Sequence, residues 1–229
     1  MLQLHQANTV FVTGTDTEVG KTFCSEALLA AWALQGLRVA GYKPVASGID
    51  SNGCNEDVLA LQAASNVCNI HAKHNIHTYA EATAPHLAAQ DSGMAIDIKQ
   101  MSGQLALWQQ HTDLVLVEGA GGWHTPLNEH TDFADWVAAE RLPVVLVVGI
   151  KLGAINHALL TAHAIAAAGL PFLGWIANCI TPQPHRLDDY VASLAARLPA
   201  PLLGVLPHMS GSSAAERASH LDLTRLQWP

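Results

Sequence analysis

Residues 11–23 read FVTGTDTEVGKTF, and this stretch decides which fold the chain can adopt. An apolar run leads into a turn with two glycines, and Gly20 is followed by Lys21 and Thr22 at the start of a helical pattern. This order of strand, glycine-rich turn, lysine, threonine and helix is typical of a loop that binds phosphate. The usual pattern has one residue fewer, because here five residues separate the glycines at positions 14 and 20.

The loop has the chemical groups that a phosphate needs. Its backbone amides and the start of the following helix would point toward phosphate oxygens. Lys21 would reach the terminal phosphates, Thr22 would offer its hydroxyl to a magnesium ion, and Gly20 would let the backbone approach closely. The additional residue removes none of these groups. The alternative interpretation is an ordinary turn between a strand and a helix.

Composition favours a single large α/β domain over residues 1–229, because this length is short for two ordinary domains. Half of the residues are hydrophobic and 13% are charged, so a sizeable core is expected and disorder is not. The formal net charge is -8, and no basic run is present. Nucleic acid and anionic membranes are therefore poor candidates for the main partner.

The sequence also indicates a cytoplasmic protein. The first ten residues, MLQLHQANTV, lack the basic region and long apolar run of a secretory signal. The most apolar stretch, residues 144–150, is far too short to span a bilayer. Cysteines at positions 24, 54, 68 and 179 lack paired metal-binding spacing, so we interpret them as reduced thiols.

Histidine is unusually common, with 13 residues. His71, His74 and His77 stand three apart, so they could align on one face of a helix and hold a metal. Asn75 and Thr78 argue against a continuous helix there. The alternative is a polar loop that happens to be rich in histidine.

Apolar runs and helical patterns alternate along the chain, which predicts a mostly parallel sheet flanked by helices on both faces. The expected strands are residues 9–14, 37–44, 113–119, 143–150, 172–178 and 201–207. The expected helices are residues 21–35, 56–64, 98–110, 154–168 and 185–197, with Gly36 and Gly169 as caps at two helix ends. Ligands of such sheets bind at the carboxyl ends of the strands.

Three charged residues fall at or near those strand ends. Lys43 ends the second strand, where it could lie beside the phosphate loop or simply be solvated. Asp57 lies at the start of an expected helix, a place where any helix favours an acidic residue. Glu118 closes an apolar strand, where a carboxylate is costly without a partner, and this position favours a magnesium ligand.

The run VTGTDTEVGKT (12–22) resembles the N-terminus of the dethiobiotin synthetase family, whose members have this longer loop. The similarity continues in GYKPVASG (41–48), EDVLALQ (56–62), LVEGAGGWHTPL (116–127), FADW (133–136), LPVVLVVGIKLGAINHALLT (142–161) and PAPLLGVLP (199–207). These motifs cover most of the chain in the same order, and together they are far more specific than one loop. The resemblance implies an α/β fold of the P-loop NTPase type.

The resemblance also implies which residues bind ATP and Mg²⁺. Lys21 and Lys43 would be catalytic. The metal would be held by Thr22, Asp57 and Glu118, and the nucleotide would be contacted by Glu18, Val19, Gly20, Lys21, Thr22, Phe23, Asp57, Glu118, Gly119, Ala120, Gly121, Asn178, Cys179, Pro207, His208 and Met209. Asn178 matches the asparagine that recognises adenine, whereas Cys179 stands where the family often has an acid. The residues after Met209 depart from the family pattern.

A substrate site between two subunits follows from the same resemblance. Thr17 would lie near the amines and the carbamate of the substrate, and Ser47 would contact the substrate. The substrate carboxylate would be held by residues of the neighbouring subunit, namely Lys151, Gly153, Ala154, Asn156 and Tyr190. Tyr190 could instead be an ordinary tyrosine packed on a helix surface. A homodimer is therefore expected.

The implied reaction closes a cyclic urea at the expense of ATP. 7,8-Diaminononanoate (7,8-diaminopelargonic acid) and CO₂ would form a carbamate, then a carbamic-phosphoric anhydride, and finally dethiobiotin, ADP and phosphate, as a step of biotin biosynthesis. One rival is an ATPase switch of the partitioning type, which usually has a second lysine early in its loop. This chain has Gly14, Thr15 and Asp16 there.

Two weaker rivals complete the set of alternatives. A GTPase is disfavoured because the chain contains no Asn-Lys-x-Asp guanine motif. A scaffold or metal-binding protein built on a decayed version of the fold is disfavoured because the charged residues of the expected site are intact. Phosphate release that depends on the diamine would separate the enzyme from these rivals.

Overall fold

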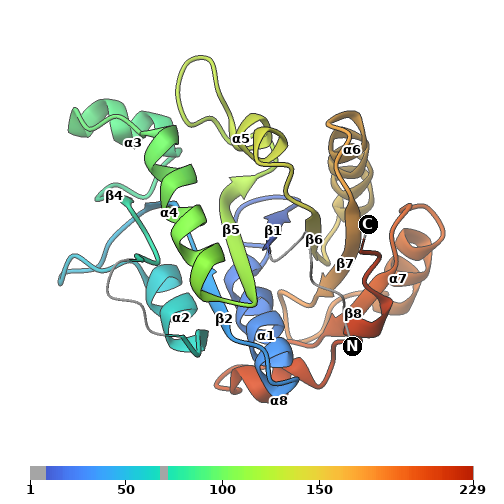
Figure 1. Ribbon diagram of the computed structural model, residues 1–229. Coiled ribbons are helices and arrows are strands. Elements are labelled where there is room, and N and C mark those ends of the chain that lie inside the picture. The colour runs from blue at the N-terminus through green and yellow to red at the C-terminus, as the bar shows by residue number, and fades with distance from the viewer. Residues whose placement is uncertain (1–8, 68–71, 229) are drawn as a thin grey trace.

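The computed structural model describes residues 9–67 and 72–228, and a six-stranded sheet forms its centre (Figure 1). The strands lie in the order β2-β5-β1-β6-β7-β8, and every neighbouring pair is parallel. Their bounds are Thr9–Gly14 for β1, Val39–Tyr42 for β2, Leu114–Gly122 for β5, Val144–Gly149 for β6, Phe172–Asn178 for β7 and Leu202–Leu206 for β8. All six predicted strands are present, and the predicted fold class is confirmed.

The strands are mostly apolar because both faces of the sheet are covered. In β1, Val10 and Val12 pack with residues of α1 (Lys21–Leu34) on one face, whereas Phe11 packs with residues of α4 (Ile98–His111) on the other. All three of these strand residues are at most 1% exposed. A polar side chain in a strand buried on both faces needs a partner inside the protein, which explains why the runs are mostly apolar.

The helices cover the two faces as the alternating pattern predicts (Figure 1). Those on the β1 face that carries Val10 are α1, α2 (Glu56–Ala64) and α8 (Ala214–Ala218), and those on the opposite face are α4, α5 (Phe133–Ala139), α6 (Ala154–Ala167) and α7 (Leu187–Ala195). Gly36 and Gly169 follow α1 and α6 with φ of 84° and 69°, which confirms them as helix-ending residues. The prediction for α7 was two residues too long at each end.

Several short elements were not predicted. β3 (Val45–Ser47) and β4 (His77–Tyr79) pair in parallel as a separate two-stranded sheet, and α3 (Pro85–Ser92) packs beside it. A 3₁₀ turn, η1 (Leu223–Arg225), lies near the C-terminus. Elements of three to eight residues contain too few positions to show a clear hydrophobic period.

The possible helical alignment of histidines is wrong, because His77 lies in β4. Nδ1 of His74 is 2.6 Å from the carbonyl oxygen of Gly41, so this ring contacts the backbone of the sheet. His71 lies outside the described residues. Across 9–67 and 72–228, no group of three or more His, Cys, Asp or Glu side chains is arranged to hold a metal ion.

Two further expectations concern the surroundings of the protein. Cys24, Cys54 and Cys179 are free thiols, while Cys68 and the first eight residues lie outside the described part. Among the helices that the structure describes, none combines the length and apolar character needed to cross a membrane.

Candidate active site

The phosphate-binding loop starts at the centre of the sheet, because β1 lies between β5 and β6. The loop is tied to its neighbour by the amide of Thr15, which donates to the carbonyl of Val147 at 3.1 Å. Gly20 ends the loop as the N-cap of α1 with φ of 84°. A Cβ at Gly20 would lie 2.1 Å from Nδ2 of Asn178, so both the backbone conformation and the space require glycine.

Lys21, the first residue of α1, is held inside the loop. Its Nζ donates to the backbone oxygen of Asp16 at 3.3 Å, and the Asp16 carboxylate pairs with Nζ of Lys151 at 3.1 Å. Burial, helped by the nearby charge of Lys43, lowers the pKa of Lys21 to about 8. An ammonium held in such a partly dehydrated position attracts an anion more strongly than one in water.

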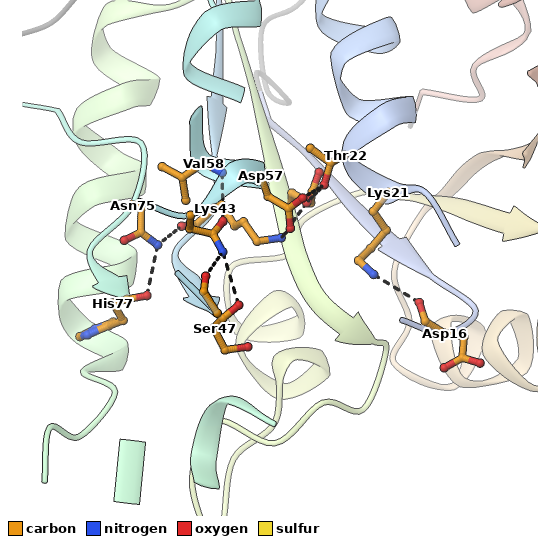
Figure 2. A network of polar contacts seen from close by, with 12 residues as sticks. Asp16, Lys21, Thr22, Lys43, Ser47, Asp57, Val58, Asn75 and His77 are labelled. Carbon is orange, nitrogen blue, oxygen red and sulfur yellow. Dashed lines mark hydrogen bonds and ion pairs between the residues drawn. The ribbon is translucent and has the colours of Figure 1, made fainter. Parts of the chain in front are cut away.

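A cluster of charged groups, in which Lys43 and Glu118 are buried and Asp57 is partly exposed, lies beside the loop, where α1, α2, β5 and the residue after β2 meet (Figure 2). Lys43 Nζ is 2.7 Å from Glu118 Oε1 and 2.9 Å from Asp57 Oδ2. The hydroxyl of Thr22 lies 2.8 Å from the same Glu118 oxygen and 2.7 Å from Asp57 Oδ1. The four residues predicted from strand and helix ends are therefore in direct contact.

The charges of this cluster stabilise one another. Burial alone would lower the pKa of Lys43, but the adjacent Glu118 and Asp57 carboxylates outweigh it and raise that pKa. Burial would likewise raise the pKa of Asp57, but Lys43 and the hydroxyl of Thr22 outweigh it and lower that pKa. The Lys43 ammonium and Asp57 carboxylate are thus both charged at neutral pH.

Glu118 has an unused oxygen atom that bears on metal binding. Its side chain is fully buried, and Oε2 has no hydrogen-bond partner among the described residues. A buried carboxylate oxygen without a partner is costly, and a cation would satisfy it. With Thr22 and Asp57, Glu118 forms a set of oxygen donors that fits a hard divalent cation such as Mg²⁺.

Two asparagines that sequence analysis did not single out support the cluster. Asn55 is the N-cap of α2, so its Oδ1 accepts from the amide of Val58, while its Nδ2 donates to the carbonyl of Gly48 at 2.7 Å. Asn75 donates to the backbone oxygen of Lys43 at 2.8 Å (Figure 2). The cap could be predicted from an asparagine before a helix, but the contact of Asn75 spans 32 residues of sequence and leaves no local signal.

The larger of two pockets at this edge of the sheet has a volume of ≈ 690 Å³. Predicted site residues that line it are Thr17, Glu18, Lys21, Lys43, Ser47, Asp57, Ala120 and Gly121. Lining residues that were not predicted come from the loop before α3 and from the end of β5 and the residues after it, namely Ala82, Thr83, Ala84, Pro85, Gly122, His124, Thr125 and Pro126. This pocket brings Lys21 and Lys43 together with Thr17 and Ser47, two of the residues predicted to contact the substrate.

A second pocket of ≈ 400 Å³ opens on the other side of Glu18 and Gly20. It is lined by Glu18, Gly20, Phe23, Asn178, Cys179, Ile180, His208, Met209, Ser210 and Gly211. Asn178 donates to the carbonyl of Val19 at 2.9 Å, and its buried Oδ1 has no hydrogen-bond partner in the described chain. The pocket therefore offers an apolar wall and an unpaired acceptor, as a purine base requires.

The segment after Met209 lines this pocket with Ser210 and Gly211, and Arg217 of α8 supports it from behind Phe23. The Arg217 guanidinium lies 4.3 Å from the centre of the Phe23 ring, and Nη1 contacts Glu26 at 2.9 Å. Phe23 lines the second pocket. Sequence analysis missed Arg217, because its partners lie near the opposite end of the chain.

Other predicted site residues lie outside both pockets of a single chain. Gly119 packs against Phe11, and Val19 and Pro207 line neither pocket. At the start of α6, Gly153, Ala154 and Asn156 also line neither, and Tyr190 packs with the α6 and α7 cluster. The residues at the start of α6 and Tyr190 therefore line neither pocket within one subunit.

Comparison with solved structures supports the fold. The septum site-determining protein MinD of Pyrococcus horikoshii, solved in complex with Mg-ADP, superposes with a TM-score of 0.59 at 15% identity, covering 93% of this chain and 92% of that chain. Identity at this level shows the fold alone. The fold and the site together define a P-loop nucleotide-binding protein, and the AAA domain family matches residues 8–216.

Two curated relatives are similar over nearly their whole length. The ATP-dependent dethiobiotin synthetase BioD 1 of Salmonella typhi is 51% identical over 221 residues, which cover 95% of this chain and 97% of the relative. The corresponding protein of Yersinia pestis bv. Antiqua is 49% identical over 226 residues, covering 95% and 94%. The chain belongs to the ATP-dependent dethiobiotin synthetase family. It is therefore an ATP-dependent ligase of biotin biosynthesis.

Replacing Lys21 with methionine is expected to stabilise the protein when no nucleotide is bound. Because the pKa of Lys21 falls from 10.5 to about 8 on folding, the unfolded chain binds more protons between these values, and stability rises with pH there. Below about pH 8, keeping the buried ammonium charged lowers the free energy of unfolding by up to ~3 kcal/mol. Near pH 7, the free energy of unfolding of Lys21→Met should exceed that of the unmodified protein by up to this amount. The difference should become smaller as the pH approaches 10.5.

Urea unfolding at several pH values measures this effect. Lys99→Met, at an exposed position of α4, is the matched control and should show no such gain. A Lys21→Met protein that is less stable near pH 7, or whose gain does not change with pH, would contradict the assignment of a desolvated ammonium.

Proposed function

We propose that this enzyme converts 7,8-diaminononanoate, CO₂ and ATP to dethiobiotin, ADP and phosphate. The single observation that carries the proposal is the position of Lys43. Its buried ammonium contacts Glu118 and Asp57, and it lines the same pocket as Lys21 of the phosphate loop. Family membership supports the substrate, and the pocket supports the chemistry.

The reaction proceeds in three stages. An amine of the substrate adds to CO₂ and loses a proton to give a carbamate. A carbamate oxygen then attacks the terminal phosphorus of ATP, and ADP leaves with the electrons of the broken P–O bond. The second amine attacks the carbamic-phosphoric anhydride, a C–N bond forms, and the phosphate leaves as the C–O bond breaks.

Residues of the larger pocket are suited to stabilise the phosphoryl transfer. Lys21 and Lys43 place two ammonium groups where negative charge develops on the transferring phosphoryl group. Thr22, Asp57 and Glu118 would hold Mg²⁺, which neutralises phosphate charge when bound. Thr17 and Ser47 line the pocket and would position the amines and the carbamate. Holding both reacting ends in one pocket makes ring closure intramolecular, which can lower the barrier by several kcal/mol, up to about 7–11.

The second pocket would bind the adenine ring. The unpaired Oδ1 of Asn178 can accept a hydrogen bond from the exocyclic amine of adenine. His208 and Met209 would pack on the base, with Pro207 supporting the turn. The backbone from Glu18 to Phe23 would follow the phosphates, and Gly119, Ala120 and Gly121 would let the backbone pass close to the nucleotide. Asn178 would make the first contact with adenine. At the next position Cys179 has a thiol, which binds a base more weakly than an acidic side chain would.

The substrate carboxylate would be bound across a homodimer interface. Lys151, Gly153, Ala154 and Asn156 lie at the start of α6, whose free amides suit a carboxylate. Leu152 in this segment is 92% exposed, and Leu160 on α6 is 61% exposed. Two large apolar side chains exposed beside these residues support burial against a second subunit, which would add Tyr190 to the site.

We assign the reaction to the cytoplasm and treat residues 1–229 as one catalytic domain. The free thiols of Cys24, Cys54 and Cys179 suit a reducing compartment. Lys21, Lys43, Ser47 and Asp57 come from different elements but line one pocket, which supports a single domain.

Phosphate release from ATP with Mg²⁺ and bicarbonate, with and without 7,8-diaminononanoate, tests the function. The expected result is release that requires the diamine, with one dethiobiotin formed for each phosphate. Phosphate release at the same rate with and without the diamine would instead indicate a partitioning-type ATPase switch. If no phosphate is released, only nucleotide binding would be supported.

Lys43→Ala is expected to lower kcat by at least ~10²-fold, because the variant lacks an ammonium that stabilises the transferring phosphoryl group. ATP binding, measured by calorimetry, should persist because the loop and the second pocket are unchanged. The variant leaves Glu118 without its cationic partner, which could destabilise the fold. Circular dichroism therefore serves as the check that the variant is folded. Unchanged turnover would reject the catalytic role of Lys43.

Gel filtration at assay concentration is expected to give a dimer. Leu152→Asp should shift the protein toward monomer and raise KM for the diamine, because a charge replaces an apolar contact near the carboxylate site. Leu34→Asp, at a 73% exposed position of α1, is the control and should leave both properties unchanged. A monomer for the unmodified protein would rule out the shared substrate site.

A further inference from the structure

His124 and Asp132 form a polar pair at the larger pocket, and neither residue has a role in the proposed binding of ATP, Mg²⁺ or substrate. Nδ1 of His124 lies 2.6 Å from Oδ2 of Asp132. His124 lines the ≈ 690 Å³ pocket together with Lys21 and Lys43. The histidine side chain is 65% exposed, so one side of the ring is open to solvent while the residue borders the reaction site.

Asp132 is held in place by the start of α5. As N-cap it accepts from the amide of Asp135 at 2.9 Å through Oδ1, and its own amide donates to the Asp135 carboxylate at 3.0 Å. This capping box occupies one carboxylate oxygen and leaves the other for His124. Because both ends of the box are fixed, the acceptor for the imidazole is also fixed.

This arrangement determines which nitrogen of His124 can accept a proton. An Nδ1–H that donates to a carboxylate leaves the lone pair on Nε2. Nε2 has no hydrogen-bond partner among the residues that the structure describes. The ring also packs edge-on to buried Trp123, with 6.4 Å between ring centres, which restricts its rotation.

We propose that His124, oriented by Asp132, accepts the proton that the substrate amine loses during urea formation. The inference rests on the proposed dethiobiotin-forming function. An aliphatic amine like that of lysine has a pKa of about 10.4, so it enters largely as ammonium and must lose a proton before its nitrogen can attack. The ammonium gives one proton to Nε2 before the attack. In ring closure the C–N bond forms, the C–O bond to phosphate breaks with its electrons on phosphate, and the second proton of that nitrogen goes to the released phosphate.

The other charged groups of the pocket are less suited to accept that proton. The lining residues are Glu18, Lys21, Lys43 and Asp57, and Asp132 with Asp135 face His124 from α5. Lys43 and Asp57 are committed to their ion pair, and Lys21 is the cation of the phosphate loop. Glu18 is a residue of that loop and also lines the second pocket, where the nucleotide is proposed to bind. Imidazole is the side chain best matched to proton transfer near neutral pH. Solvent on its exposed side can then take the proton away.

The test is the pH profile of dethiobiotin formation by His124→Gln. Near pH 7 we expect kcat to fall by ~10²-fold, in the range of general-base catalysis, and to recover as the pH approaches that at which the amine deprotonates unaided. Added imidazole should restore part of the rate, because the site is open to solvent. The KM for ATP should remain unchanged.

Two further variants make the result specific. Asp132→Asn retains an N-cap for α5 but loses the carboxylate that selects the tautomer, so kcat should fall while the unfolding midpoint stays close to that of the unmodified protein. His130→Gln, exposed in the same loop, is the matched control and should leave the pH profile unchanged.

The outcomes separate this inference from the function on which it rests. If the unmodified enzyme forms no dethiobiotin, the proposed function fails. If it does, but His124→Gln keeps the full rate and profile, His124 is not the proton acceptor. A loss that is equal at all pH values and is not rescued by imidazole would also overturn the inference, because it would indicate a structural role.

Discussion

The carboxylate of Glu118 is fully buried, and the whole site depends on the ammonium of Lys43 that contacts it at 2.7 Å. A charge without a partner at that depth would be destabilising by roughly 3–5 kcal/mol. The partners come from different parts of the chain: Thr22 from the start of α1, Lys43 from the end of β2 and Asp57 from the start of α2. Folding of the sheet therefore brings these partners together and gives the buried Glu118 carboxylate the contacts that it needs.

The main sheet could be predicted from sequence because its strands are buried on both faces. Continuous apolar runs mark such strands, and the helices between them are long enough to show a period. β3 and β4 escaped prediction because each has three residues and is stabilised by pairing with the other, 32 positions away in sequence. The helices α3, α5 and α8 are also too short for a clear hydrophobic pattern. The start of α5 is marked instead by its N-cap Asp132, and the start of α8 by its N-cap Ser213.

The charged part of the site was predictable for a geometric reason. The carboxyl ends of parallel strands meet at one edge, so Lys43 and Glu118 could be expected near the phosphate loop before their contact was known. Contacts made through the backbone were not predictable, because Asn75 reaches the carbonyl of Lys43 from a separate segment. The pairing of His124 with Asp132 was also missed, since a histidine eight residues before an N-cap has no distinctive spacing.

The contact of Arg217 with Phe23 has a consequence for how the protein is made. The two residues are 194 positions apart, yet Arg217 holds the ring of Phe23, which lines the proposed adenine pocket. A nascent chain can complete the phosphate loop early, but Phe23 gains this support only after α8 has left the ribosome. Full nucleotide affinity should thus appear late in synthesis, so a chain truncated before α8 would be a folded loop without its finished pocket.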